Sequence, residues 1–122
     1  MSRPVACLAG LIGAAGVALA ALSTHAYAGT SLNVAASMLS LHAPALLAIA
    51  FGRSAGMLAP RIADVAAAAL ILGLLLFSGD LAWRAFAGSA LFPMAAPTGG
   101  VLLIGGWLLT ALSGLAGGSA RA

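Results

Sequence analysis

VACLAGLIGAAGVALAAL, residues 5–22, is an unbroken run of 18 residues without a charge. A bilayer core of about 30 Å needs about 20 apolar residues in a helix, so this run is long enough to cross a membrane. Comparable apolar stretches follow, and we expect helices over residues 5–24, 32–52, 62–82 and 99–118. The sequence therefore predicts an all-α integral membrane four-helix bundle, a single transmembrane domain over residues 1–122.

The composition also indicates a membrane protein. Of 122 residues, 63% are hydrophobic and 6% are charged, which is too little polar surface for a soluble domain of this size. The net charge of +3 comes from scattered arginines that form no basic patch, so we expect no nucleic-acid partner. The lipid bilayer is the first partner that the composition implies.

Residues that hold metals or cofactors are scarce. Cys7 is the only cysteine, which excludes an intrachain disulfide and a cysteine-based zinc site. His25 and His42 lie 17 positions apart, a spacing that is typical of no metal site. The sequence contains no recognisable nucleophile with its base, carboxylate dyad, phosphate loop or haem motif. We therefore expect no enzymatic activity, no catalytic residues, no metal and no cofactor.

The placement of the arginines predicts the orientation of the chain. With four spans and short connections, the amino terminus, the second connection and the carboxyl terminus share one side of the membrane. That side carries Arg3, Arg53, Arg61 and Arg121, and the other side carries Arg84. Because positive residues near helix ends are retained in the cytoplasm, we expect both termini there, in a multi-pass protein of the bacterial plasma (inner) membrane.

ALSTHAYAG, residues 21–29, raises an alternative for the first span. Its Ala26-Tyr27-Ala28 segment has the small-x-small form of a signal-peptidase site. A signal peptide, however, has an apolar region of about 7 to 15 residues, shorter than the run that precedes this site. We expect the segment to be retained as a transmembrane helix, with cleavage before Gly29 as the alternative.

Polar residues inside the predicted spans mark where chemistry would have to lie. His42 lies about ten residues into the second span, and Pro44 is expected to kink that helix by leaving the carbonyl of Ser40 without a donor. The favoured interpretation of His42 is a neutral imidazole bonded to a neighbouring helix, and a proton relay, a metal ligand or a quinone contact is the alternative. His25 is expected at the wetted outer end of the first helix.

Charged residues lie close to the predicted ends of the third span. Asp80 and Arg84 are four positions apart with the acid first, the favourable order for an ion pair on a helix. Trp83 between them suits the interfacial belt. At the opposite end, Asp64 is expected to lie near Arg61, as a helix-start carboxylate beside an anchoring cation.

Small residues four positions apart predict where helices approach one another closely. Three stripes have this spacing: Ala6, Gly10, Ala14 and Ala18; Gly106, Thr110, Gly114 and Gly118; and, more weakly, Ala66, Ala69 and Gly73.

Four segments together resemble a known family. They are THA at 24–26, LHAPALLAIA at 41–50, LLLFSGDL at 74–81 and PTGGVLLIGGWLLTA at 97–111. They look like the small bacterial membrane proteins grouped as domain of unknown function 423, which are related to the eukaryotic transmembrane protein 256. The resemblance covers nearly the whole sequence and implies four membrane helices, but no established activity.

The resemblance also singles out residues. Matching places the two family histidines on His25 and His42, and the FSG turn on residues 77–79. The family's PxGG…GW element falls on Pro97, Gly99, Gly100, Gly106 and Trp107. The sequence departs from the family pattern at Leu41, where an aromatic residue is frequent, at Asp80, where a small polar residue is usual, and in the short uncharged stretch between the histidines.

Two functions fit these features. The first is an accessory or structural subunit that packs against a larger membrane complex, and the alternative is a small oligomeric transporter or channel for an ion or small molecule. A redox or quinone-linked component that uses His42 is a weaker third possibility. We therefore expect a membrane-protein partner or a homo-oligomer. His25, His42, Asp80 and Arg84 are the candidate functional or structural residues.

Overall fold

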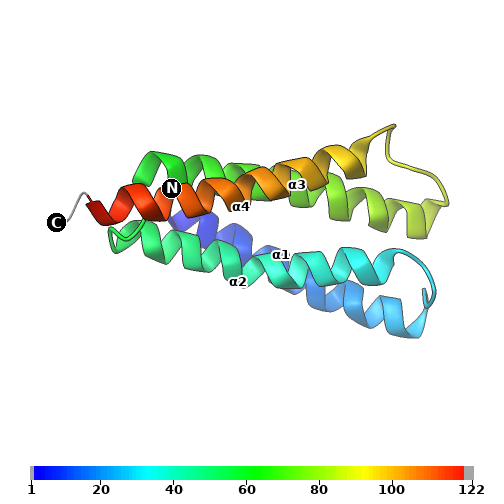
Figure 1. Cartoon of the computed structure of the whole chain (residues 1–122). Coiled ribbons are helices and arrows are strands. Elements are labelled where there is room, and N and C mark those ends of the chain that lie inside the picture. The colour runs from blue at the N-terminus through cyan, green and yellow to red at the C-terminus, as the bar shows by residue number, and fades with distance from the viewer. Residues whose placement is uncertain (1, 120–122) are drawn as a thin grey trace.

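The computed structural model describes residues 2–119 of the chain (Figure 1). Within them lie four helices, α1 (Ser2–His25), α2 (Leu32–Ser54), α3 (Pro60–Ala87) and α4 (Ala95–Ser119). Each helix is long and apolar enough to cross a membrane, so the predicted all-α fold with four membrane spans is confirmed. Arg121, which entered the orientation prediction, lies outside the described residues.

Helix α3 is longer than the predicted span of 62–82, and its two ends explain why. Pro60 stands at its start, where the fixed φ of proline suits the first helical turn and its missing N–H removes no bond. Gly88 ends the helix with a φ of 79°, and its N–H donates to the carbonyl of Arg84 at 2.9 Å. The helix therefore continues through the charged and aromatic residues that follow position 82.

Prolines also lie within α2 and α4. Helix α4 begins at Ala95 rather than near 99, because Pro97 lies in its first turn, where backbone N–H groups have no acceptor within the helix. Helix α2 contains Pro44 and is continuous from Leu32 to Ser54.

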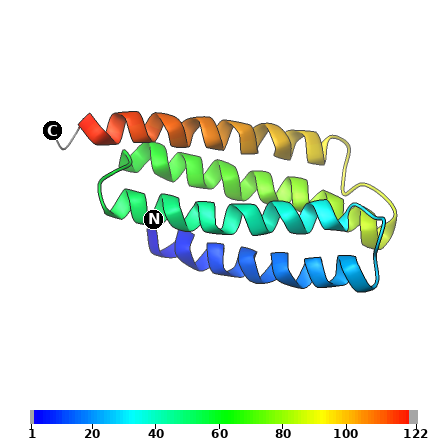
Figure 2. The same cartoon turned by 60° about the horizontal axis from the view of Figure 1, so that its bottom comes forward.

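Helices that are consecutive in the chain form the extensive interfaces, α1 with α2, α2 with α3, and α3 with α4. Figure 2 shows α1 and α4 at opposite edges of the molecule. A closed bundle would also pack α1 against α4, so the predicted bundle is open along one side. Apolar side chains such as Val17 and Leu115 are 70% and 79% exposed. In a membrane they contact lipid tails, which are as apolar as a neighbouring helix, so no hydrophobic driving force closes the bundle.

The start of α1 and the end of α4 lie toward the same end of the molecule (Figure 1). We call this the terminal end, which also contains the connection of residues 55–59. The opposite end contains the connections of residues 26–31 and 88–94, and we call it the far end.

The stripe of small residues predicted on α1 is wrong. A Cβ on Gly10 would meet no other atom within 4 Å, and Ala14 and Ala18 are exposed. The buried residues of α1 are instead Val5, Ala9, Gly16 and Ser23, which are spaced by four, seven and seven positions. A helix turns about 100° per residue, so steps of four drift by about 40° each, whereas steps of seven stay on one face.

The small-residue stripes predicted on α3 and α4 are partly correct. Gly73 and Ala66 are buried on α3, whereas Ala69 is partly exposed. A Cβ at Gly99 would lie 2.5 Å from the backbone nitrogen of Phe77, and one at Gly106 would lie 2.7 Å from the Leu70 side chain. Glycine is therefore required at both positions, because the two helices touch there.

Candidate functional site

His42 lies on the inner face of α2, only 1% exposed, with both ring nitrogens in hydrogen bonds. Nδ1 lies 2.8 Å from the carbonyl oxygen of Met38, and Nε2 lies 3.0 Å from Nε1 of Trp107. A carbonyl only accepts and an indole N–H only donates, so His42 donates from Nδ1 and accepts at Nε2. The imidazole is therefore neutral, with its proton on Nδ1.

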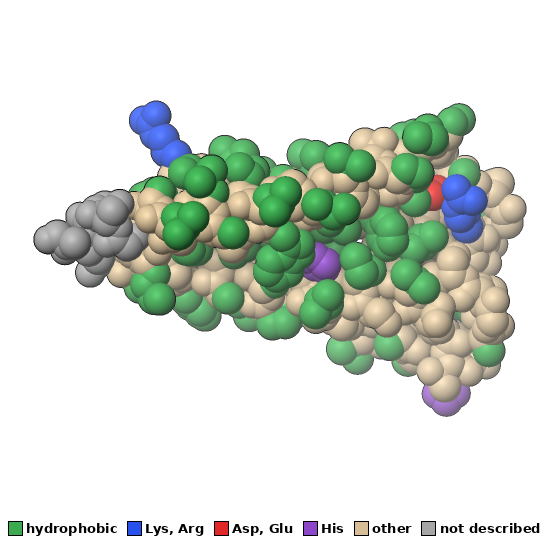
Figure 3. Space-filling view, viewed as in Figure 1, with side chains coloured by type: hydrophobic (Ala, Val, Ile, Leu, Met, Phe, Trp, Pro, Cys, Tyr) green, Lys and Arg blue, Asp and Glu red, His purple; other side chains and the backbone are tan. Residues whose placement is uncertain are grey.

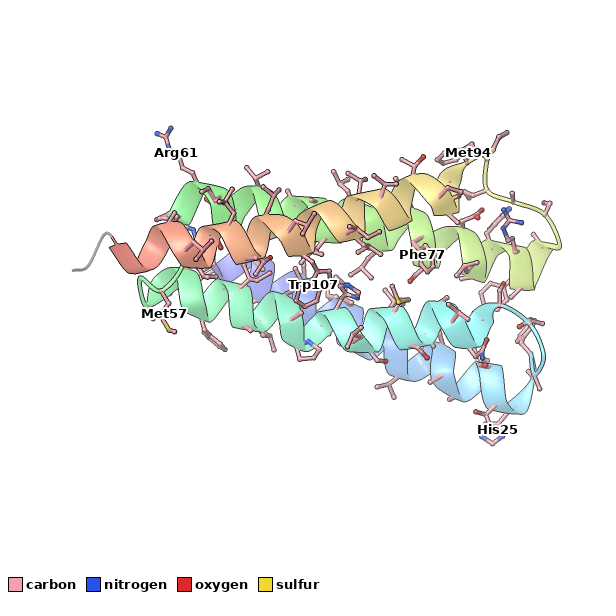
Figure 4. All side chains as sticks on the ribbon, in the orientation of Figure 1. His25, Met57, Arg61, Phe77, Met94 and Trp107 are labelled. Carbon is pink, nitrogen blue, oxygen red and sulfur yellow. The ribbon has the colours of Figure 1, made fainter. Side chains whose placement is uncertain are left out.

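Trp107 brings α4 to this histidine. Figure 4 shows it projecting from α4 toward α2, and the two ring centroids are 5.7 Å apart at an angle of 59°. The indole–imidazole bond thus joins two helices that share no extensive interface. It fixes the separation of the hairpins α1–α2 and α3–α4 near the middle of the spans.

An apolar groove begins beside this bond and runs toward the terminal end. It has a volume of about 510 Å³ and lies between the second half of α2 and α4, with Trp107 in its wall. Its other lining residues include Ala45, Ala48, Phe51 and Met57. We call it the apolar groove. It opens on a face that is covered mainly by hydrophobic side chains (Figure 3).

Asp80 forms a second polar site, at the far end of the molecule. Its side chain is fully buried, and its Oδ2 accepts a hydrogen bond from Nε of Arg84 at 2.9 Å. Its Oδ1 accepts from the backbone N–H of Leu91 at 2.7 Å. The ion pair predicted from the spacing is therefore present, and the carboxylate also anchors the connection between α3 and α4.

Further hydrogen bonds hold α2 to α3 around this site. The hydroxyl of Ser31 donates to the carbonyl of Leu81 at 2.8 Å, and the hydroxyl of Ser78 donates to the carbonyl of Ala35 at 3.2 Å. These contacts use backbone carbonyls as acceptors, which keeps the hydroxyl groups paired inside an apolar environment.

The predicted pairing of Asp64 with Arg61 is wrong. Asp64 accepts two hydrogen bonds from Arg53 instead, with Nε–Oδ1 and Nη2–Oδ2 distances of 2.6 and 3.1 Å. Arg61 projects away from the helices (Figure 4). The reason is that residues 53 and 64 flank the same short connection on facing sides of α2 and α3, while position 61 lies on the outer side of α3.

The residues 10–100 match a family model described as protein of unknown function (DUF423). The chain belongs to the DUF423 family. The matched region extends from α1 to the start of α4 and contains His42 and Asp80, while Trp107 lies beyond it. No curated protein and no solved structure matches the chain.

The two histidines singled out in this DUF423 chain do not form one site. His25 is exposed at the end of α1, at the far end of the molecule (Figure 4), whereas His42 is buried near the middle of α2. Within residues 2–119, no three His, Cys, Asp or Glu side chains are close enough together to hold a metal ion. The structure therefore brings His42 together with Trp107, and Asp80 together with Arg84. These two pairs form separate sites.

Sequence reasoning missed two partners in the DUF423 chain. The Trp107 donor lies 65 positions from His42, and the Leu91 amide lies 11 positions from Asp80. The sequence singles out Trp107 only as part of a motif, and its pairing with His42 needs the packing of α4 beside α2. A backbone amide in a connection carries no signal in the sequence.

Proposed function

We propose that this DUF423 protein is a structural or accessory subunit of a larger complex in a bacterial inner membrane, without catalysis of its own. The observation that carries the proposal is that the buried polar side chains of the described spans have hydrogen-bond partners. Within the described part of the chain, no buried side-chain nitrogen or oxygen lacks a hydrogen-bond partner. A catalytic or transporting site needs a polar atom that is available to its substrate.

His42 is the residue on which the alternatives depend, and its environment supports a packing role. A proton relay needs a ring nitrogen that can reach a second proton carrier, and a metal needs a free lone pair. Both nitrogens of His42 are committed, one to Met38 and one to Trp107. The ring therefore stabilises the contact between α2 and α4.

The apolar groove supports the subunit role from the outside. It is concave, contains no charged side chain, and faces the lipid between two helices. Side chains of a partner helix would fill it by the close packing that drives helix association in membranes. The aromatic rings of Phe51 and Trp107 would supply the largest contact areas.

The proposed orientation places both termini in the cytoplasm. The terminal end carries Arg3, Arg53 and Arg61, and the far end carries Arg84. Arginines are enriched in short loops that lie on the cytoplasmic side of the membrane, and neighbouring acidic residues have little effect on this preference. A reporter that is active only in the cytoplasm should be active when it is fused to the carboxyl terminus. A reporter that is active only in the periplasm should be silent there. The reverse result would contradict this orientation.

The test of the subunit role compares two phenylalanine substitutions. Ala48→Phe fills the apolar groove, and Ala14→Phe places the same ring on an exposed face of α1, as a matched control. Tagged wild-type protein in a mild detergent should carry a stoichiometric membrane-protein partner. Ala48→Phe should lose that partner and Ala14→Phe should keep it, with unchanged thermal unfolding of both.

The alternative is a small oligomeric transporter or channel. The observation in its favour is a group of hydroxyl and amide side chains on the outer surface of α1 and α2, which an oligomer could turn inward. Purified protein alone in liposomes would then support a flux of ions or small solutes. Such a flux, together with the lack of a stoichiometric partner, would contradict the subunit role.

A further inference from the structure

The connection between α3 and α4, residues 88–94, folds back along α3. Asp80 lies seven residues before Ala87, the last residue of α3, which is about 10 Å along the helix at about 1.5 Å per residue. The backbone N–H of Leu91 nevertheless reaches Oδ1 of Asp80 at 2.7 Å. Figure 1 accordingly shows α4 beginning well short of the end of α3. Leu91 is therefore held beside α3 rather than beyond its end.

Two ion pairs on α3 show where this connection lies in the membrane. Near the terminal end, Asp64 pairs with Arg53. Near the far end, Asp80 pairs with Arg84. The two acidic residues are 16 positions apart, about 24 Å along the helix, which is close to the hydrocarbon thickness of about 30 Å. Charged groups are unfavourable deep in the core, so each pair lies at one boundary of it, and Leu91 lies at the level of Asp80.

Arg84 keeps hydrogen-bond donors free at this boundary. A guanidinium has five N–H groups. The Nε group donates to Asp80 at 2.9 Å, and the other four make no hydrogen bond to the described residues. The side chain is 47% exposed, so an acceptor outside the chain can reach these groups. Asp80 offsets the charge and fixes the direction of the guanidinium, but it leaves most of the donors without an acceptor.

Apolar side chains lie next to these donors. Arg84 and Leu91 bond to the two oxygens of one carboxylate, so the guanidinium and the backbone of the connection are neighbours. The side chains of Leu91 and Phe92 are 45% and 46% exposed. At the right of Figure 3, a basic and an acidic side chain lie together, with hydrophobic side chains beside them. Free donors beside an exposed apolar surface fit a ligand that is both anionic and apolar.

We propose that the far end binds a phospholipid, with Arg84 donating to its phosphate and the side chains of Leu91 and Phe92 contacting its acyl chains. We call these three residues the lipid site. Guanidinium N–H groups bind phosphate oxygens in pairs, which fits the unbonded side of Arg84. The phosphate of a phospholipid lies at the boundary of the hydrocarbon core and its chains begin directly below, so both halves of the lipid meet their counterparts at one level.

The apolar half of the lipid site distinguishes a phospholipid from free phosphate. Inorganic phosphate would use Arg84 alone, and the adjacent Asp80 carboxylate would repel it, because the ion pair has no net charge to attract a small anion. A phospholipid adds the contacts of its chains with Leu91 and Phe92. The proposal does not depend on the subunit role, since the lipid site lies at the far end and the apolar groove runs toward the terminal end.

Native mass spectrometry of the purified chain in a non-ionic detergent tests the lipid site with three probes. Dioleoyl phosphatidylglycerol should bind with saturation. Dioleoylglycerol, which has the same chains and no phosphate, should bind about ten-fold more weakly, the effect of losing a hydrogen bond to a charged group. Inorganic phosphate at millimolar concentration should displace no lipid. Equal binding of dioleoylglycerol, binding without saturation, or displacement by inorganic phosphate would each overturn the proposal, the last in favour of a free-anion site.

Two variants test the two halves of the lipid site. Arg84→Lys keeps a cation beside Asp80 but removes the planar guanidinium, and Phe92→Ser leaves the ion pair intact. Each should weaken phosphatidylglycerol binding several-fold in a chain that thermal unfolding shows to be folded. The matched controls Arg61→Lys and Phe51→Ser lie away from the site and should change binding by less than about two-fold.

Full affinity in either folded variant would overturn the proposal, as would equal losses in the controls. If Arg84→Lys does not fold, Phe92→Ser decides the outcome, because it removes no partner of Asp80.

Discussion

Replacing Arg84 by alanine removes one partner of the ion pair at the far end and leaves the other buried. The Asp80 side chain is 0% exposed, and the side chain of Arg84 is 47% exposed. After the substitution, the carboxylate keeps only the N–H of Leu91 as a partner. Its second oxygen then has no donor among the described residues and must draw water into the site.

The size of the effect follows from these exposures. Breaking a fully buried pair costs roughly 3–5 kcal/mol, whereas an exposed pair contributes under about 1 kcal/mol. Because Arg84 is half exposed, water can reach its place, and we expect Arg84→Ala to lower the free energy of unfolding by about 2 kcal/mol. Adding Asp80→Asn removes the charge and keeps an oxygen for Leu91, so the double variant should lose only about 1 kcal/mol.

Unfolding in nanodiscs of fixed lipid composition measures whether the double variant is more stable than Arg84→Ala alone. Any binding partner is held at constant concentration. The control is Arg61→Ala, since Arg61 projects away from the helices, and it should change stability by less than about 0.5 kcal/mol. If the loss of unfolding free energy in the double variant equals the sum of the losses in the two single variants, Asp80 and Arg84 do not interact energetically. This result would refute the prediction.

Three further results are expected. Trp107→Phe should lower the free energy of unfolding by about 1 kcal/mol, because it leaves Nε2 of buried His42 without a donor; an unchanged unfolding curve would contradict this. Arg53→Gln should cost about 1 kcal/mol through the loss of its partly buried, two-bond pairing with Asp64, and chemical denaturation would measure it. Mass spectrometry of the purified protein should find peptides from residues 5–22, since α1 packs on α2, and a uniform amino terminus at Gly29 would contradict retention of α1.

The membrane spans could be predicted because lipid imposes one simple requirement. Each span must be a long apolar helix with its backbone bonds satisfied internally, and this requirement is visible in the sequence as an apolar run. The helix ends were less predictable, since Pro60 and Pro97 stand inside the first turns of α3 and α4 rather than before them. Apolar residues surround every helix, so their pattern did not indicate which faces meet.

The polar contacts could be predicted only where they are local. Asp80 and Arg84 lie on one helix, so their spacing determines their contact. Arg53 and Asp64 lie on two helices, and their contact depends on the rotation of α2 against α3. A signal did exist, because both residues flank the short connection of residues 55–59 and so must lie at the same end of adjacent helices.

The protonation of the His42 ring tests most directly the claim that this residue serves helix packing rather than chemistry. Nitrogen-15 NMR of histidine-labelled protein in nanodiscs distinguishes the two ring nitrogens by their chemical shifts. We expect a neutral ring with its proton on Nδ1, and a change in the Nε2 shift when Trp107→Phe removes the indole donor. A proton on Nε2, or an Nε2 shift that does not respond to Trp107→Phe, would contradict it.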